Sequence, residues 1–270
     1  LTIKAARGDI VSADGVVMAP DQPVFQVNVN SQTLDGLEDE ERANVISSLV
    51  NILADPEVTA ESIEQALKDN RYRKYKPVMI KSNLDMQTVS EIEAHRLELP
   101  GVSVTTEPKR VYLQDEVAGH VIGYLGEVNQ EELGANENYK LGDLVGKIGV
   151  EKFYDEYLRG EDGVQQVEVD VYNNAVGEVT TVDASSGNDV FLTIDYELQK
   201  SMEDAFDKVI SDLQRNSRSD KAGAGAAVLL DVKTGKVLAM VSRPNDKVTQ
   251  QNRAIQGRYI PGSTFKPVTL

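Results

Sequence analysis

The strongest constraint on the fold is a change of pattern near residue 190. The segment YELQKSMEDAFDKVISDLQRN has the three- and four-residue apolar spacing of a helix with one buried face. Before it stands VFLTID, and after it AAVLLD and KVLAMVS, two almost continuously apolar segments joined by VKTG. Such strands are typical of a sheet covered on both faces. The order strand, helix, hairpin predicts the start of an α/β domain. The residues expected to face inward on the helix are Leu198, Met202, Ala205, Phe206, Val209, Ile210 and Leu213.

The chain before this point mixes strands and helices in a different way. Asp14-Gly15 stands between apolar runs and predicts a hairpin, and the alternation in PVFQVNVN predicts a strand with one solvent-exposed face. Helical spacing predicts helices over 38–55, 59–70, 84–99 and 149–159, the second with Thr59 as N-cap or Ser62 as the alternative. VQQVEVDVYNNAVGEV predicts a hairpin that turns at Asn173-Asn174.

The small polar segment DASSGND separates the two patterns, and we place a domain boundary there. The expected organisation is an α+β domain over residues 1–185, followed by the N-terminal part of an α/β domain over residues 186–270. The chain begins with Leu1 and ends soon after a new helix starts, so we expect it to be a segment of a longer protein.

Composition narrows the possible functions. The formal net charge of −16 argues against binding to nucleic acid or to an anionic membrane surface, because both favour basic patches. The absence of cysteine excludes disulfides and thiolate metal sites, and the only histidines, His95 and His120, are not at a ligand spacing. We therefore expect no metal and no cofactor. No stretch approaches the roughly 20 apolar residues of a membrane-spanning helix.

The segment RYIPGSTFKPVTL carries the clearest candidate chemistry. Pro261-Gly262 allows a sharp entry into a helix, and Pro267 fixes the helix start, because a proline in a helix interior costs about 3 kcal/mol. Ser263 and Lys266 would then lie on one face of the first turn. A lysine buried there would have a lowered pKa and could take the proton that makes serine nucleophilic. Ser263 is thus the candidate nucleophile and Lys266 the candidate general base.

Taken alone, Ser-x-x-Lys is a weak signal, since about one copy is expected by chance in a chain of this length. The alternative is a serine N-cap followed by a solvated lysine. The surrounding sequence favours the catalytic interpretation, because Ser-x-x-Lys is one of three motifs of penicillin-binding proteins and class A β-lactamases.

The segment NRAIQGRYIPGSTFKPVTL closely resembles the nucleophile region of class B penicillin-binding proteins. GNDVFLTIDYELQ and GAAVLLDVKTGKVLAMVSRP resemble the entry and first hairpin of their transpeptidase domain. Upstream, ARGDIVSADGVVMA, AGHVIGYLGEV and GDLVGKIGVEKFYDEYLRGEDG resemble motifs of their N-terminal pedestal, also called the dimerisation domain. These matches follow the order of the family and span nearly the whole chain.

The resemblance implies a pedestal over residues 1–185 and the incomplete start of a serine β-lactamase-like transpeptidase domain over residues 186–270. It implies a D,D-transpeptidase that cross-links peptidoglycan stem peptides ending in D-Ala-D-Ala and is acylated by β-lactams at Ser263. It also implies contact with a SEDS-type glycosyltransferase and other cell-wall synthesis proteins. The expected location is the extracytoplasmic face of the bacterial cytoplasmic membrane, with an N-terminal anchor outside this chain.

Two segments imitate the other motifs of the family. Lys233-Thr234-Gly235 matches K-T-G, and Ser186-Gly187-Asn188 matches S-x-N, but both precede the nucleophile, whereas the family places both after it. We interpret the first as a hairpin loop and the second as an interdomain link. Without the genuine motifs, this chain alone is expected to be inactive. The alternatives are a non-catalytic interaction module and, ranked lower, a β-lactam sensor or β-lactamase-like protein.

Overall fold

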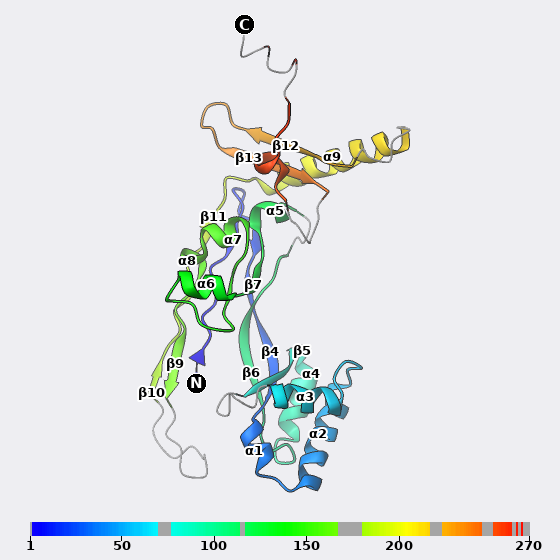
Figure 1. Ribbon diagram of the computed structural model, residues 1–270, viewed down its shortest axis with the longest axis vertical. Helices are drawn as coiled ribbons and strands as arrows, with labels where there is room; N and C mark the ends of the chain where they lie inside the picture. The colour runs from blue at the N-terminus through cyan, green and yellow to red at the C-terminus, as the bar shows by residue number, and fades with distance from the viewer. Residues whose placement is uncertain are drawn as a thin grey trace. The chain divides into compact units, whose positions relative to one another are not determined.

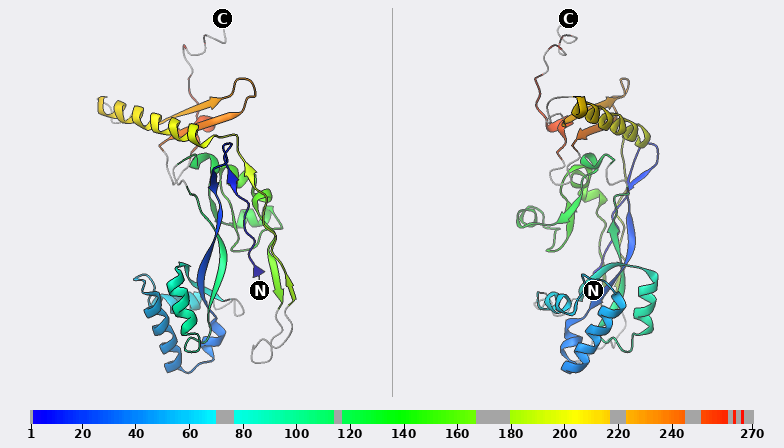
Figure 2. Two further views of the ribbon diagram at one scale, coloured as in Figure 1. Left: turned by 180° about the vertical axis from the view of Figure 1, so that it is seen from behind. Right: turned by 90° about the vertical axis from the view of Figure 1, so that its right-hand side faces the viewer.

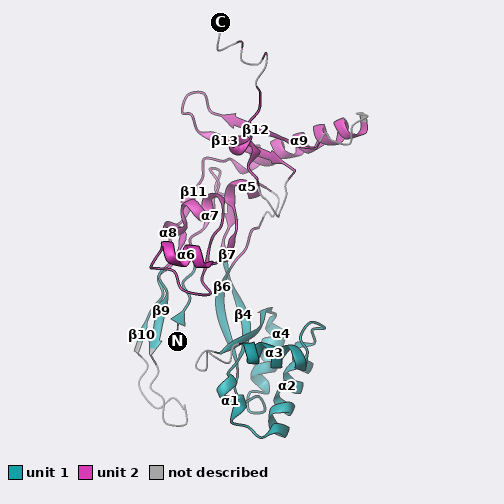
Figure 3. Cartoon of the chain, viewed as in Figure 1, with its two compact units in different colours: residues 1–6, 21–109, 161–185 teal, residues 7–20, 110–160, 186–270 magenta. Residues whose placement is uncertain are grey.

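The computed structural model describes residues 2–69, 77–113, 117–166, 180–216, 223–244 and 251–260, together with Ser263 and Lys266. The chain divides into two compact units, each assembled from separate stretches (Figure 3). Unit 1 contains residues 1–6, 21–109 and 161–185, and unit 2 contains residues 7–20, 110–160 and 186–270. The chain passes between the units several times, and the domain boundary after residue 185 stays a prediction.

Unit 1 is built on a three-stranded sheet with β4 in the centre. β4 (Asp21–Val29) pairs antiparallel with β5 (Val78–Leu84) and lies beside β6 (Val102–Arg110). Helices lie at one end of this sheet (Figure 1). They are α1 (Ser31–Asp35), α2 (Asp39–Leu53), α3 (Ala60–Asp69) and α4 (Met86–Ala94).

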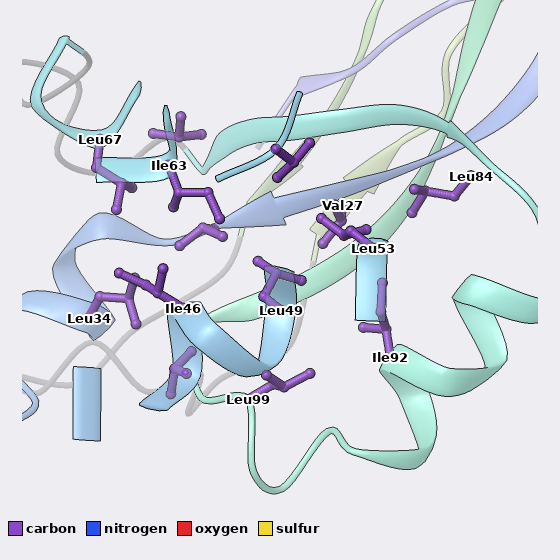
Figure 4. Packing of buried hydrophobic residues seen from close by; sticks show 14 residues of the cluster. Val27, Leu34, Ile46, Leu49, Leu53, Ile63, Leu67, Leu84, Ile92 and Leu99 are labelled. Atoms are coloured by element: carbon purple, nitrogen blue, oxygen red, sulfur yellow. The ribbon is translucent and has the colours of Figure 1, made fainter. Parts of the chain in front are cut away.

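The core of unit 1 lies between these helices and the sheet (Figure 4). Val27 of β4 is fully buried and belongs to the same cluster as Leu49 of α2, Ile63 of α3 and Ile92 of α4. The periodicity of residues 38–55 placed the buried stripe of α2 correctly, since Val45, Ile46, Leu49 and Leu53 are buried. Thr59 is confirmed as the N-cap of α3, because its hydroxyl oxygen accepts from the backbone N–H of Ser62 at 3.1 Å.

Two predictions for unit 1 are wrong in detail. The solvent-exposed face predicted for β4 is absent at the C-terminal end of the strand. Gln26 and Asn28 are buried there along with their apolar neighbours. β4 is the central strand, and Asn28 is satisfied there by donating from Nδ2 to Thr105 Oγ1 at 2.8 Å. The helix expected over 84–99 ends at Ala94, and tight turns lead from His95 to Gly101, where φ is +82°.

A second sheet in unit 1 joins the chain's start to a later hairpin. β9 (Gly163–Gln166) pairs antiparallel with both β1 (Thr2–Ile3) and β10 (Thr180–Val182). The antiparallel pairing of β9 and β10 agrees with the predicted hairpin. The predicted turn at Asn173-Asn174 lies outside the described residues.

Unit 2 brings distant short strands together. β2 (Ile10–Val11) pairs antiparallel with β3 (Val17–Ala19) around the predicted turn, where Gly15 has a φ of +86°. β2 also pairs in parallel with β11 (Val190–Phe191), and β7 (Leu125–Glu127) pairs antiparallel with β8 (Leu144–Gly146). The short helices of this part are α5 (Gly119–Ile122), α6 (Gln130–Ala135), α7 (Gly149–Phe153) and α8 (Asp155–Leu158). The single helix expected over 149–159 is therefore interrupted, and the break lies at Tyr154, whose φ and ψ are −106° and 22°.

The predicted helix and hairpin after residue 190 are present. α9 (Tyr196–Asn216) packs against β13 (Val237–Arg243), which pairs antiparallel with β12 (Gly225–Leu230) (Figure 2). Asp195 caps α9 by accepting from the N–H of Leu198, and Asp14 from the β2–β3 turn accepts from the N–H of Tyr196, each at 2.9 Å. The helix thus begins where two carboxylates meet its free N–H groups.

The expected inward stripe of α9 is wrong in part. Met202, Phe206 and Ile210 are partly buried, but Leu198, Ala205, Val209 and Leu213 are exposed. Val228, Leu229 and Leu230 of β12 are also exposed. The sequence predicted a sheet covered on both faces, but the described residues leave part of this hairpin uncovered. The physical reason is that α9 is held against β13 by two polar residues, Gln199 bonding to Met240 and Glu203 to Arg243.

A buried ionic cluster holds the earlier stretches of unit 2 together. Glu151 has no exposed surface, and its two carboxylate oxygens accept from Arg7 Nε and Arg110 Nε, both at 2.7 Å. Arg7 Nη2 also lies 2.8 Å from Asp155 Oδ1, which accepts from the N–H of Gly146 at 2.9 Å. Arg110 Nη1 donates to the carbonyl oxygen of Gly8 at 2.8 Å. Because each charge is paired and hydrogen-bonded, burial of the cluster is tolerated.

Replacing Glu151 with Ala should strongly destabilise unit 2. The change leaves two buried guanidinium groups without their shared carboxylate, which costs about 3–5 kcal/mol. Urea unfolding followed by circular dichroism measures the loss. The control is Glu156→Ala in the next helix, because Glu156 is exposed and its loss should cost less than about 0.5 kcal/mol. Equal stability of the two variants would contradict this account of the cluster.

Candidate active site

Ser263 and Lys266 both lie where the backbone is helical, with a tight 3-10 turn at Ser263 and α-helical geometry at Lys266. Both residues are exposed. The burial that the sequence argument required of Lys266 is therefore not provided by the described part of the chain. The assignment of nucleophile and general base stays a prediction.

The segment that leads to Ser263 is docked on β13. Its helix α10 (Arg253–Gln256) is capped by Asn252, whose Oδ1 accepts from the N–H of Ala254 at 3.1 Å. The hydroxyl of Ser242 in β13 donates to the carbonyl oxygen of Gln251 at 2.7 Å and accepts from the N–H of Arg253 at 3.1 Å. Ser242 and Asn252 are both buried, so this attachment is partly shielded from water. The position of α10 is consequently set by β13.

A second buried charge lies where α5 meets α9 and β13. One carboxylate oxygen of Glu203 accepts from the N–H of Ala118, which precedes α5, at 2.9 Å. The other accepts from Arg243 Nη2 at 3.1 Å. Arg243 also donates from Nε and Nη2 to Asp207 at 2.6 and 3.0 Å. Glu203 therefore ties the stretch before α5 to the hairpin within unit 2.

His120 of α5 is buried near Arg243, and neither ring nitrogen has a hydrogen-bond partner of ordinary geometry among the described residues. Burial lowers the pKa of His120 to about 4, and the positive charge of Arg243 acts in the same direction. The backbone of Met240 opposes this shift only in part. The ring is therefore held neutral at physiological pH.

The two segments that imitate family motifs have structural roles. Lys233-Thr234-Gly235 lies in the loop between β12 and β13, where Gly235 has a φ of +72° and Asp231 accepts from the N–H of Lys233 at 3.0 Å. Ser186-Gly187-Asn188 lies outside any helix or strand. A Cβ on Gly187 would stand 1.8 Å from the carbonyl oxygen of Leu158, so close packing requires glycine there. The hairpin loop predicted for the first segment agrees with this placement, whereas the interdomain link predicted for the second stays a prediction.

Comparison with known proteins gives the family. The profile of the penicillin-binding protein dimerisation domain matches residues 2–192, and that of the penicillin-binding protein transpeptidase domain matches residues 225–270. The chain belongs to the class B penicillin-binding proteins. The α+β dimerisation domain followed by a partial transpeptidase domain is the fold class predicted from the sequence.

The chain is similar in sequence to peptidoglycan D,D-transpeptidases. The chain is 33% identical to the peptidoglycan D,D-transpeptidase MrdA of Acinetobacter baumannii, over 97% of this chain and 39% of that protein. It is 28% identical to MrdA of Escherichia coli K12, over 98% of this chain and 43% of that protein. The chain thus spans about two fifths of the length of these curated relatives.

Solved structures show the same fold. A complex between the penicillin-binding protein PBP2 and MreC from Helicobacter pylori matches with a TM-score of 0.64 and 24% identity, over 90% of this chain and 42% of that chain. A chain from a peptidoglycan synthase complex, described as coordinating polymerization and crosslinking, matches with a TM-score of 0.65 and 27% identity. That match covers 100% of this chain and 47% of the other chain.

Other kinds of site receive little support in the described parts of this penicillin-binding protein. A cavity of 330 Å³ in unit 1 is lined in part by Asp35, Arg42 and Glu64, but the arginine already pairs with both carboxylates. Within the described ranges, no cluster of three His, Asp or Glu residues could hold a metal ion. None of the helices described above is both long and apolar enough to cross a membrane.

Two buried polar residues of α9 were not predicted from the sequence. Glu203 and Gln199 are four residues apart on α9, within the stripe expected to be apolar. The sequence did contain a signal for them, namely a Gln and a Glu within an otherwise apolar stripe. Polar residues buried in such a stripe require hydrogen-bond partners, so a polar contact of α9 could have been predicted.

Acid should destabilise unit 2 through His120. The unfolded imidazole has a pKa near 6.5 and the folded one a pKa of about 4, so the unfolded state takes up the proton first as the pH falls. The stability provided by the neutral ring is complete above pH 6.5 and is lost as the pH falls towards 4. The shift corresponds to roughly 3 kcal/mol.

The measurement is the urea midpoint between pH 7.5 and pH 4 for the wild-type chain and for His120→Leu. The variant should lose less stability over this window, because it has no proton to take up. His95→Leu is the control, since His95 is exposed and should leave the pH dependence unchanged. A slope for His120→Leu equal to that of the wild type would refute the assignment.

Proposed function

We propose that the protein containing this chain is a serine D,D-transpeptidase that cross-links peptidoglycan, with Ser263 as nucleophile and Lys266 as general base. The observation that carries the proposal is the match of residues 225–270 to the transpeptidase domain, which includes the only Ser-x-x-Lys of the chain. The helical backbone at each of the two residues supports it, because the motif is expected at the start of a helix.

The reaction proposed has two steps. Lys266 takes the hydroxyl proton while Ser263 Oγ attacks the carbonyl carbon of the penultimate D-Ala in a stem peptide ending in D-Ala-D-Ala. The terminal D-Ala leaves with a proton as its amine, and an acyl-enzyme ester remains. The amine of a neighbouring stem peptide then attacks the ester, forms the cross-link and restores the serine. A β-lactam would acylate the same oxygen by opening its ring. No metal or cofactor takes part in this scheme.

The rest of the proposal concerns organisation and location. We place the pedestal in residues 1–185 and the start of the transpeptidase domain in residues 186–270. The pedestal would hold the catalytic domain at the extracytoplasmic face of the cytoplasmic membrane, on an anchor outside this chain. Its partners would be a SEDS-type glycosyltransferase and other cell-wall synthesis proteins. Support comes from relatives solved in a complex with MreC and in a peptidoglycan synthase complex.

A second candidate is a non-catalytic scaffold for cell-wall synthesis. The observation in its favour is that Ser263 and Lys266 are exposed and the two imitating segments have structural roles. In that case residues 1–270 would act only by binding partners. Labelling with a fluorescent penicillin separates the two candidates.

The full-length protein should be labelled at Ser263 by a fluorescent penicillin, and the 270-residue chain should not be. The reason is that oxyanion donors make a large contribution to acyl transfer, and K-T-G and S-x-N of this chain are used elsewhere. Mass spectrometry of the peptide that holds Ser263 gives the position of the label.

Ser263→Ala should abolish labelling of the full-length protein, and Lys266→Ala should slow it by at least about a hundredfold. Lys233→Ala is the matched control, because it changes a lysine of the hairpin loop and should leave labelling unchanged. Labelling of the full-length protein at another residue, or none at all, would favour the scaffold.

A further inference from the structure

The helix α9 buries polar residues and exposes apolar ones. Gln199 has no exposed surface and Glu203 is 4% exposed, whereas Leu198, Val209 and Leu213 are each more than two fifths exposed. Burying an amide and a carboxylate costs free energy unless both are fully hydrogen-bonded, and apolar residues of similar size would often be at least as stable. The arrangement therefore calls for an explanation other than stability.

Gln199 binds the backbone of β13 at a single residue. Its Nε2 donates to the carbonyl oxygen of Met240 at 2.7 Å, and its Oε1 accepts from the N–H of Met240 at 2.7 Å. The side chain thus takes the place of a neighbouring strand at this edge of β13. The same Nε2 lies 2.6 Å from Glu203 Oε1, so the Gln199 amide is held by Glu203 as well.

Met240 leads directly to the docked segment. Its sulfur accepts from Asn252 Nδ2 at 3.2 Å, and Asn252 is the cap of α10. The N–H of Asn252 in turn donates to Gln256 Oε1 at 3.1 Å. A continuous series of partly buried contacts therefore runs from Gln199 through Met240 and Asn252 to α10, the last described helix before Ser263.

Glu203 fixes the other end of the same strand. It accepts from Arg243, the last residue of β13, and from the N–H of Ala118. Gln199 and Glu203 together hold β13 at two points one helical turn apart on α9. The stretch 117–122 is attached to the second of these points.

We propose that Gln199 is a positioning residue for the nucleophile, which it aligns through Met240, Asn252 and α10, and that Glu203 locks its amide in the required orientation. This inference rests on the proposed function for its catalytic meaning. Small displacements of a reacting group are costly, since a shift of about 1 Å can lower a rate by up to a hundredfold.

The test compares Gln199→Met with Gln214→Met in the full-length protein. Gln214 lies on the same helix and is exposed, so the control makes the same replacement without touching β13. Stopped-flow labelling with a fluorescent penicillin separates the dissociation constant of the initial complex from the acylation rate constant. Gln199→Met should lower the acylation rate constant by about tenfold or more and change the dissociation constant by less than twofold. Gln214→Met should change neither.

Hydrogen–deuterium exchange of residues 251–256 provides a readout that does not depend on activity. Gln199→Met should speed exchange of the Ala254 and Gln256 amides in the 270-residue chain and in the full-length protein, and Gln214→Met should not. If Gln199→Met fails to fold, Asn252→Ala replaces it and should show the same two effects, because it breaks the series at its other end.

The outcomes are distinguishable. An unchanged acylation rate constant in a Gln199→Met protein of reduced stability would make Gln199 a structural residue only and overturn the inference. If the wild-type protein is not labelled at Ser263, the proposed function fails. Faster exchange at 251–256 in Gln199→Met would then still support positioning of α10, and unchanged exchange would reject it.

Discussion

The buried carboxylate of Glu151 is the condition on which the assembly of unit 2 depends. A negative charge with no exposed surface is tolerated only where cations and N–H donors surround it, and here the cations come from residues 7 and 110. These residues are far apart in the chain, so pairing them forces the stretches around them together. The parallel pairing of β2 with β11 then adds residues 190–191 to the same body. Unit 2 is thus organised by charge pairing as much as by apolar burial.

Glu203 repeats this principle where α9 meets β13. Its carboxylate satisfies a backbone N–H before α5, the amide of Gln199 and the guanidinium of Arg243. A group of connected hydrogen bonds specifies one arrangement of its residues more strictly than an apolar contact of equal area, because hydrogen bonds have preferred directions. The exposed apolar residues of α9 and β12 fit this view, since the helix is oriented by its buried polar residues. The neutral ring of His120 beside Arg243 makes the same junction sensitive to acid.

Local pattern was enough to predict the elements but not the pairing between distant ones. The helices α2, α3 and α9 and the turns at Gly15 and Gly235 followed from periodicity and turn chemistry, which act over a few residues. The burial of Asn28 and the buried face of α9 depend on partners more than 30 residues away. Such partners leave no trace in a short window of sequence. Ser263 and Lys266 were selected from motif and context, whereas Gln199 could be found only from its contacts.

The meaning of a short motif therefore depends on where the fold places it. Lys233-Thr234-Gly235 has the letters of a catalytic motif, yet its glycine provides a positive φ in a hairpin loop and Asp231 accepts hydrogen bonds within that loop. Ser-x-x-Lys is a less specific motif, but the segment before Ser263 is attached to β13. Ser242 of β13 bonds to Gln251, and Met240 of β13 bonds to Asn252. Attachment to a rigid strand is what a nucleophile requires, since its oxygen must be held in place before the reaction. In the proposed enzyme, Gln199 would therefore position the nucleophile through these contacts rather than by touching the substrate.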